Sequence, residues 1–308
     1  VIGQEVVPDS GCGSWLFEPQ STNLITQSNL LTAISGGVVT LNAAISPDGT
    51  TNAIKVNFDT GSNSGGTISV ASSPAAASTE YTFSFYAKNF SGDGTFRLRL
   101  DTDTQIALVN ETFTATAEWV RYTHTFTTDA SASSFGSNSR FRKSTTTDNN
   151  EVLFFGMQLE QQSFATSYIP TSGTSVTRNQ DVCTNGGSLA SINSTEGTLY
   201  FEGSTLVNGG EHRIISLSDG TNDNLIYIRF DSTASRFRGF ARGSSGSYNI
   251  ITANSINQTN NNKVALVWDA TNFKIWINGT ERDSTALTTN LPVAMNTFAF
   301  TSPSASNN

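Results

Sequence analysis

The chain has little of what marks several large classes of protein. Only 14% of its 308 residues are charged, two are histidine, two are cysteine and seven are proline. Lysine and arginine total 17 against 25 aspartate and glutamate, a net charge of −8. The basic surface typical of nucleic-acid binding is therefore missing, and no nucleic-acid partner is expected. No run of about 18 apolar residues occurs, which predicts no transmembrane helix and no membrane insertion.

Motifs for catalysis are also scarce. The E-x-D-x-x-E spacing of one family of glycan-cleaving jelly rolls does not occur, and the nearest carboxylate pairs, Asp101 with Asp103 and Asp219 with Asp223, lie in predicted turns. G-x-S-x-G and GxxxxGK[ST] are absent, and the two distant cysteines do not suit a zinc site. The chain is therefore predicted not to be an enzyme and to require no cofactor.

What the chain does have is alternation. Apolar residues form 36% of it and come in short runs of period two, while helix-type spacing is nearly absent. Residues 81–88 and 96–101 alternate around a Gly/Asp turn at 91–94, which predicts a hairpin with one apolar and one polar face. Asn278-Gly279 between two alternating runs predicts another hairpin. The sequence thus predicts an all-β protein of two domains.

The polar face of the first predicted hairpin is a candidate ligand face. Sugar binding needs exposed rings that stack on pyranose faces beside planar polar groups. Tyr86 and Lys88 alternate away from the apolar face, Arg97 and Arg99 do so on the following strand, and Gln158 lies opposite Met157 and Leu159. The alternative is a solvated sheet surface, or a face covered by a neighbouring subunit.

Two further surface features are predicted in the second half of the chain. Trp276 alternates against Ile275 and Ile277 and is expected to be exposed beside Lys274. Arg238 lies in a basic stripe with Arg236 and Arg242, which could meet an anionic polysaccharide or acidic partner. Surface pairing of these arginines with nearby carboxylates is the alternative, and we favour it.

Turns and cysteines offer the remaining candidate sites. Asp48 in SPDGTTN, and Asp219 and Asp223 in SDGTNDN, could supply ligands to a structural calcium ion, although such turns also form through local hydrogen bonds alone. Cys12 and Cys183 stand on either side of the first predicted domain. Because domain termini often lie close together, these cysteines either form a disulfide or are two free thiols.

Two segments of the first half resemble a known family. Residues 156–173 read GMQLEQQSFATSYIPTSG and precede Val176-Thr177-Arg178, and residues 12–24 read CGSWLFEPQSTNL. Residues 12–24 resemble the entry, and residues 156–178 the closing strand and exit, of a carbohydrate-binding-like β-sandwich that recurs in bacteriophage tail, fibre and spike proteins. Residues 196–204, 213–221 and 263–280 resemble a laminin-G or concanavalin-like jelly roll. Such jelly rolls normally continue beyond the segment 297–300, so the second domain is expected to be incomplete.

The resemblance implies a domain plan and a function. The plan is a lead-in segment (1–20), a carbohydrate-binding-like β-sandwich (21–170), a linker (171–194) and a truncated jelly roll (195–308). The implied function is a non-catalytic protein of the virion surface, outside the cell, that binds host glycan as a homo-oligomer beside other virion proteins. The alternatives are a structural or cementing virion protein, and an accessory module of a secreted polysaccharide-degrading enzyme.

Overall fold

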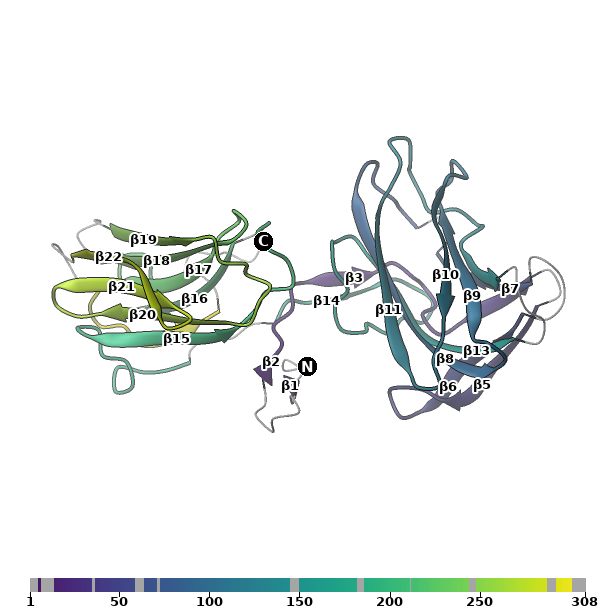
Figure 1. Cartoon of the computed structure of the whole chain (residues 1–308), viewed down its shortest axis with the longest axis horizontal. Helices are drawn as coiled ribbons and strands as arrows, with labels where there is room; N and C mark the ends of the chain where they lie inside the picture. The colour runs from purple at the N-terminus through teal and green to yellow at the C-terminus, as the bar shows by residue number, and fades with distance from the viewer. Residues whose placement is uncertain are drawn as a thin grey trace. The chain divides into compact units, whose positions relative to one another are not determined.

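The computed structural model describes two separate compact units. They comprise Val1–Asp181 and Val182–Asn308 (Figure 1). The described residues are 5–6, 14–34, 37–58, 64–70, 73–144, 150–181, 186–210, 212–243, 248–286 and 292–300. Every regular element among them is a β-strand, which confirms the all-β prediction. No described segment is a helix of the length and apolar character needed to cross a membrane.

The first unit is a sandwich of two five-stranded antiparallel sheets. One sheet has the order β10-β9-β12-β7-β4, with bounds Ala107–Thr114, Thr95–Asp101, Arg140–Lys143, Gly65–Ile68 and Leu31–Ile34. The other has the order β11-β8-β13-β6-β5, with bounds Val120–Thr127, Glu80–Ser91, Glu151–Glu160, Thr51–Asn57 and Val38–Ile45. Two short pairs complete the unit: β1 (Glu5–Val6) with β2 (Ser14–Trp15), and β3 (Ser21–Asn23) with β14 (Val176–Arg178).

The core of the first unit is aromatic. Alternation along β8 turns Phe83 and Phe85 inward, where both are fully buried. Phe141 of β12 and Phe154 of β13 belong to opposite sheets and stack with their ring centroids 4.2 Å apart. The inner faces of both sheets therefore bury their apolar residues against one another, which is the packing a sandwich requires.

The predicted hairpin of residues 81–101 is wrong. β8 pairs with β11 and β13, whereas β9 pairs with β10 and β12 in the opposite sheet. The turn between them, with Gly92 and Gly94 at positive φ, carries the chain across the sandwich. An alternating strand can bury its apolar face either beside its neighbour or opposite it, so alternation alone does not distinguish the two arrangements.

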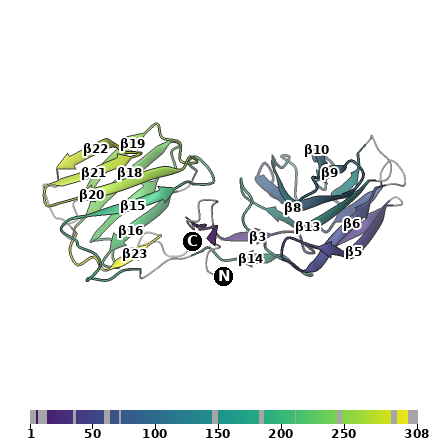
Figure 2. The ribbon, with the colours of Figure 1, turned by 60° about the horizontal axis from the view of Figure 1, so that its bottom comes forward.

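The second unit is also a two-sheet sandwich. Figure 2 shows the four-stranded sheet β15-β20-β21-β22, with bounds Gly197–Gly203, Asn262–Trp268, Asn272–Ile277 and Thr280–Ala286. The other sheet has the order β19-β18-β17-β16-β23, with bounds Tyr248–Asn254, Arg236–Arg242, Leu225–Phe230, Arg213–Ser218 and Thr297–Ala299. The hairpin predicted at Asn278-Gly279 is confirmed, since it joins β21 to β22 with both residues at positive φ.

The segment 171–194 is divided between the units. The first unit extends to Asp181, and β14 within it pairs with β3 near the start of the chain.

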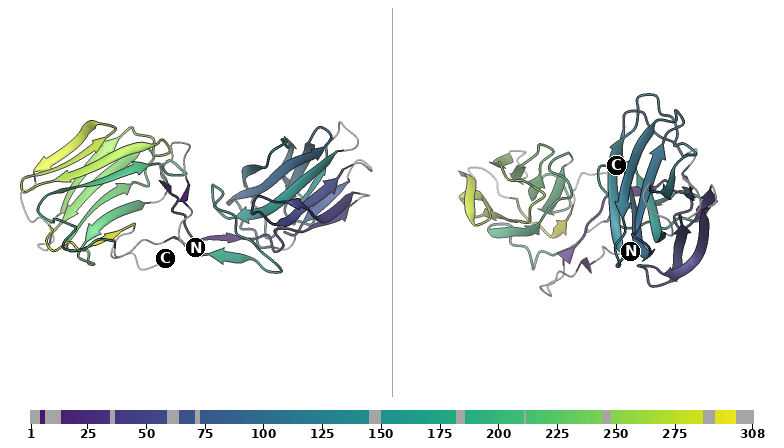
Figure 3. Two further views of the ribbon diagram at one scale, coloured as in Figure 1. Left: turned by 90° about the horizontal axis from the view of Figure 1, so that it is seen from below. Right: turned by 45° about the vertical axis from the view of Figure 1, so that its right-hand side comes forward.

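Two views in Figure 3 show the layered strands of each unit. Both units are antiparallel sandwiches, so the prediction of two consecutive β-sandwich domains is confirmed.

Candidate functional site

An open aromatic row lies on the outer face of the four-stranded sheet of the second unit. The strand register aligns Tyr200 of β15 with Ala265 of β20, and Ala265 with Trp276 of β21. Tyr200 is 54% exposed and Trp276 is 37% exposed. Because neighbouring strands lie about 4.8 Å apart, the two aromatic residues start from strands about 10 Å apart. We call the row of Tyr200, Ala265 and Trp276 the aromatic platform.

Burial of the alternate residues determines that the side chains of the platform point outward. Leu199, Leu266 and Ile275 point into the core of the second unit and are almost fully buried. Their neighbours Tyr200, Ala265 and Trp276 must therefore point outward, because successive side chains of a strand face opposite ways. Ala265, which lies between Tyr200 and Trp276 in the register, carries only a methyl group.

Charged side chains surround the platform. The Tyr200 hydroxyl donates to Glu202 Oε2 at 2.9 Å, and that hydrogen bond to the carboxylate raises the pKa of Tyr200. Glu202 also lies 3.8 Å from the Lys263 ammonium, and Lys274 lies 3.3 Å from Glu281, which is aligned with Trp276. Exposed rings with polar groups at their edges can stack on a sugar and hydrogen-bond its hydroxyls.

The sequence predicted part of this platform. Trp276 is exposed beside Lys274, as expected. Tyr200 was missed as a site residue, although its alternation with Leu199 and Phe201 indicates an outward position. What the sequence lacks is the register, which alone places Tyr200 in line with Trp276.

The ligand face predicted in the first unit does not form. Tyr86 and Lys88 lie on the outer face of the β11-β8-β13-β6-β5 sheet, while Arg97 and Arg99 lie on the opposite sheet. The cause is that the chain crosses from one sheet to the other between β8 and β9. Tyr86 is half-buried between the Arg121 guanidinium, 5.5 Å from the ring centroid, and the Phe155 ring, 5.9 Å away. These two residues come from the neighbouring strands β11 and β13, so the ring is flanked on both sides.

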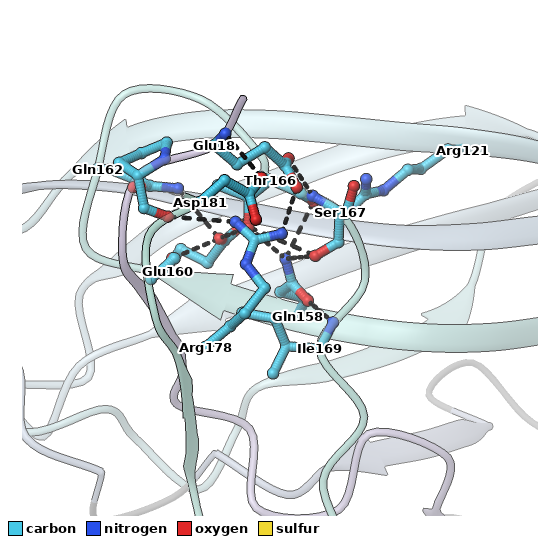
Figure 4. Close-up of polar contacts among 12 residues, drawn as sticks. Glu18, Arg121, Gln158, Glu160, Gln162, Thr166, Ser167, Ile169, Arg178 and Asp181 are labelled. Atoms are coloured by element: carbon cyan, nitrogen blue, oxygen red, sulfur yellow. Dashed lines mark hydrogen bonds and ion pairs between the residues drawn. The ribbon is translucent and has the colours of Figure 1, made fainter. Parts of the chain in front are cut away.

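Gln158 does not face solvent either. Its side chain is fully buried, because residues 162–169 cover this part of the sheet (Figure 4). Its Nε2 donates to the carbonyls of Thr166, at 3.2 Å, and Ser167, at 3.3 Å, while its Oε1 accepts from the Ile169 amide at 2.6 Å. Gln158 thus fixes the covering segment to the closing strand and is not free to bind a ligand.

The same segment is anchored by acidic side chains. Buried Glu160 accepts hydrogen bonds from Ser21, Gln162 and Thr166 (Figure 4). Buried Glu18 accepts from the Ser167 amide and forms an ion pair with Arg178 of β14. These contacts join the entry of the chain, β13 and β14, so residues 156–178 act in the architecture of the first unit.

The arginine stripe of the second unit is paired, as favoured from the sequence. Arg238 Nε lies 3.2 Å from Asp231 Oδ2, and Arg229 and Arg236 contact the same fully buried carboxylate. Arg242 lies 3.3 Å from Asp223. Arg238 therefore belongs to a local ion-pair cluster. Desolvation opposes ionisation of Asp231, but the Thr233 amide and the three arginines more than offset it and lower its pKa well below the usual range.

This cluster predicts a pH-dependent stability. We expect Asp231→Asn to lower the free energy of unfolding of the second unit by about 3 kcal/mol at pH 7, because three arginines lose their shared counter-ion. The folded pKa is depressed, so the advantage of the wild type is present above pH 3.8 and shrinks as pH falls below that value. Urea unfolding of both proteins at pH 7 and pH 3 measures this. A difference that does not shrink at pH 3 would contradict it.

The predicted calcium turns are closed by their own hydrogen bonds. Asp48 accepts from Ser46, Thr50 and Asn52; desolvation acts against ionisation, yet these bonds lower the pKa of Asp48 to about 2. Asp219 accepts from Thr221 and Asn224. Within the described ranges, no three His, Cys, Asp or Glu side chains gather as metal ligands. Calcium binding by Asp48, Asp219 or Asp223 stays a prediction. Cys12 and Cys183 lie outside the described residues.

Comparisons with known proteins bear mainly on the second unit. Residues 176–307, less than half of the chain, match a family described as the concanavalin A-like lectin/glucanases superfamily, Laminin_G_3. A search of curated proteins finds no match. The laminin-G-like jelly roll expected for the second half of the chain is therefore confirmed.

Similar solved structures include xylanase modules. The Clostridium thermocellum xylanase 10B CBM22-1-GH10 modules with xylohexaose are 16% identical over 47% of this chain and 29% of that one, with a TM-score of 0.32. The CBM22-1 xylan-binding domain of Paenibacillus barcinonensis Xyn10C is 14% identical over 47% and 94%, at 0.33. Its CBM22-1-CBM22-2 tandem is 10% identical over 97% and 96%, at 0.32. TM-scores this low do not establish a shared fold. Residues 176–307 are thus similar to the concanavalin A-like lectins and glucanases.

Proposed function

We propose that this protein is a non-catalytic surface protein of a phage virion that recognises a host glycan, and that the aromatic platform is its ligand site. The observation that carries the proposal is the alignment of exposed Tyr200 and Trp276 across Ala265. Two rings carried by strands about 10 Å apart do not stack on one pyranose, so the ligand is at least a disaccharide. The match of this unit to a family of lectins and glucanases supports a sugar ligand.

The polar groups at the platform support recognition without cleavage. Glu202 is engaged by Tyr200 and Lys263, and Glu281 by Lys274. These pairs hold planar carboxylates and ammonium groups at the ring edges, where sugar hydroxyls would lie. The open surface gives weak single-site affinity, so display of several copies in a homo-oligomer would supply the avidity.

The virion assignment rests on the resemblance of residues 12–24 and 156–178 to phage tail, fibre and spike proteins. Gln158 and Glu160 in this pattern use their side chains in buried hydrogen bonds, so the pattern specifies the fold of the first unit and does not identify a ligand. Placement on the virion surface and contacts with other virion proteins form part of the proposal. Structural calcium at the Asp48 or Asp219 turn would add rigidity but is not needed for ring stacking.

A structural or cementing role is the second candidate. It is favoured by β5, an edge strand that exposes Val38 by 57%, Leu41 by 46% and Ile45 by 65%. Exposed apolar side chains on a sheet edge suit contact with another protein. In that role β5 would be buried in the assembled particle, and the platform would need no sugar.

A glycan array with host envelope polysaccharides tests the proposed function. We expect the wild-type protein to bind when displayed multivalently, and Ala265→Arg to lose binding, because the long side chain fills the space between the two rings. Thr127→Arg, which adds the same charge at an exposed position of β11, should bind as the wild type does. Loss of binding in both variants, or none in the wild type, would overturn the proposal. Release of reducing sugar would overturn its non-catalytic part.

A further inference from the structure

Four arginines meet on the outer face of the first unit's β10-β9-β12-β7-β4 sheet. Arg97 and Arg99 of β9 are aligned with Arg142 and Arg140 of β12, respectively. Directly opposed residues of an antiparallel pair have Cβ atoms about 5 Å apart, so the guanidinium groups share one small area. We call these four residues the arginine quartet. The sequence indicated Arg97 and Arg99 but not their partners on β12, which follow about 40 residues later.

The members of the quartet differ in their polar partners. Arg99 lies 3.3 Å from buried Asp101, and Arg142 donates to the amide oxygen of Asn110 at 2.8 Å. Neither Arg97 nor Arg140 forms an ion pair with a residue in the described part of the chain. Desolvation, followed by repulsion from Arg97, Arg140 and Arg99, lowers the pKa of Arg142. The arrangement differs from the second unit, where Asp231 neutralises three arginines.

Such a cluster costs stability in the free protein. Like charges placed opposite each other across strands are destabilising, and Arg97 and Arg140 stand opposite Arg142 and Arg99. An anionic ligand would remove the repulsion. Guanidinium groups bind carboxylates and sulfates in a planar, two-bonded geometry, and they do so better than ammonium groups.

The residues around the quartet favour an anionic polysaccharide over a nucleic acid as its ligand. Thr67 of β7 is aligned with Arg140, while Asn110 and Thr112 of β10 are aligned with Arg99 and Arg97. These short hydroxyl and amide side chains can hydrogen-bond sugar hydroxyls. The described residues of this outer face include no exposed aromatic ring on which a nucleobase could stack. The acidic net charge also disfavours a densely charged duplex.

We propose that the arginine quartet is a second binding site, specific for a polysaccharide that carries carboxylate or sulfate groups along its chain. Arg97 and Arg140 would each bind an anionic group, and Thr67, Asn110 and Thr112 would contact the intervening hydroxyls. This site lies in the first unit, and the proposal does not depend on sugar binding by the platform in the second.

Isothermal titration calorimetry with polygalacturonate, chondroitin sulfate and neutral dextran tests the site. We expect the wild type to bind at least one of the two anionic polymers and not dextran, with affinity falling more than about tenfold from roughly 0.05 to 0.5 M salt. Arg97→Gln and Arg140→Gln should each lower affinity about five- to tenfold, and the double variant should abolish binding. Comparison of the two anionic polymers distinguishes carboxylate from sulfate recognition.

Matched variants keep the test decisive. Arg282→Gln removes one charge at an exposed position of β22 and should leave binding unchanged. Thermal unfolding should show Arg140→Gln to be no less stable than the wild type, because repulsion is relieved. Binding neither anionic polymer, an Arg282→Gln effect equal to that of Arg97→Gln, or equal affinity for duplex DNA or polyglutamate would overturn the proposal.

Discussion

Trp276→Ala is expected to lower the affinity for the glycan ligand about 30-fold, and Tyr200→Ala to a similar extent. Loss of a central aromatic contact costs roughly 2 kcal/mol, which corresponds to that factor. The two rings lie on one row of the sheet, and each would stack on its own sugar, so the double variant should lose at least about 100-fold. Titration of immobilised glycan, chosen from the array, with each purified variant measures the loss.

Two controls separate stacking from general damage. Trp276→Phe keeps a ring at the same position and should retain most of the affinity. Phe90→Ala removes a ring that is 52% exposed in the first unit, which carries no residue of the platform, and should have no effect. If Trp276→Phe binds as poorly as Trp276→Ala, the indole edge and not ring stacking governs recognition. If Phe90→Ala is equally damaging, the platform is not the site.

Asn23→Ala is expected to lower the free energy of unfolding of the first unit by about 4 kcal/mol. Asn23 is fully buried in β3, and its Oδ1 accepts from the amides of Ile25, at 3.0 Å, and Leu159, at 3.1 Å. Its Nδ2 donates to the carbonyls of Met157, at 3.1 Å, and Ile169, at 2.9 Å. Truncation leaves four buried backbone groups without this partner, each costing about 1–3 kcal/mol if it stays unpaired. Partial relaxation reduces the sum.

Urea unfolding followed by unit-specific probes measures this change. Thr22→Ala is the matched control, because Thr22 is the preceding residue of β3 and its hydroxyl bonds that of Thr177 at the surface; it should cost less than about 1 kcal/mol. The second unit, a separate compact body, should unfold at an unchanged midpoint. Equal destabilisation by the two variants would show that the buried hydrogen bonds of Asn23 do not hold the first unit together.

The sequence pattern of residues 156–173 has a structural role in the first unit. Residues 156–173 contain Gln158 and Glu160, whose side chains are buried under the segment that follows β13. From alternation alone, a polar residue on a strand is predicted to face solvent. Alternation predicts which face of the sheet a residue is on, but not whether another segment covers that face. Gln158 was placed on the correct face, the outer one, but the fold covers it.

By itself, the sequence determined the fold class, the inner and outer faces of most strands, the hairpin at Asn278-Gly279 and the exposure of Trp276. Each follows from local alternation or from a turn that requires positive φ. Only the tertiary structure decided which faces share a sheet: it separated Tyr86 from Arg97, aligned Tyr200 with Trp276 and placed Arg140 opposite Arg99. Strand pairing between distant segments is set by the packing of the whole core, and period-two patterns fit several pairings equally well.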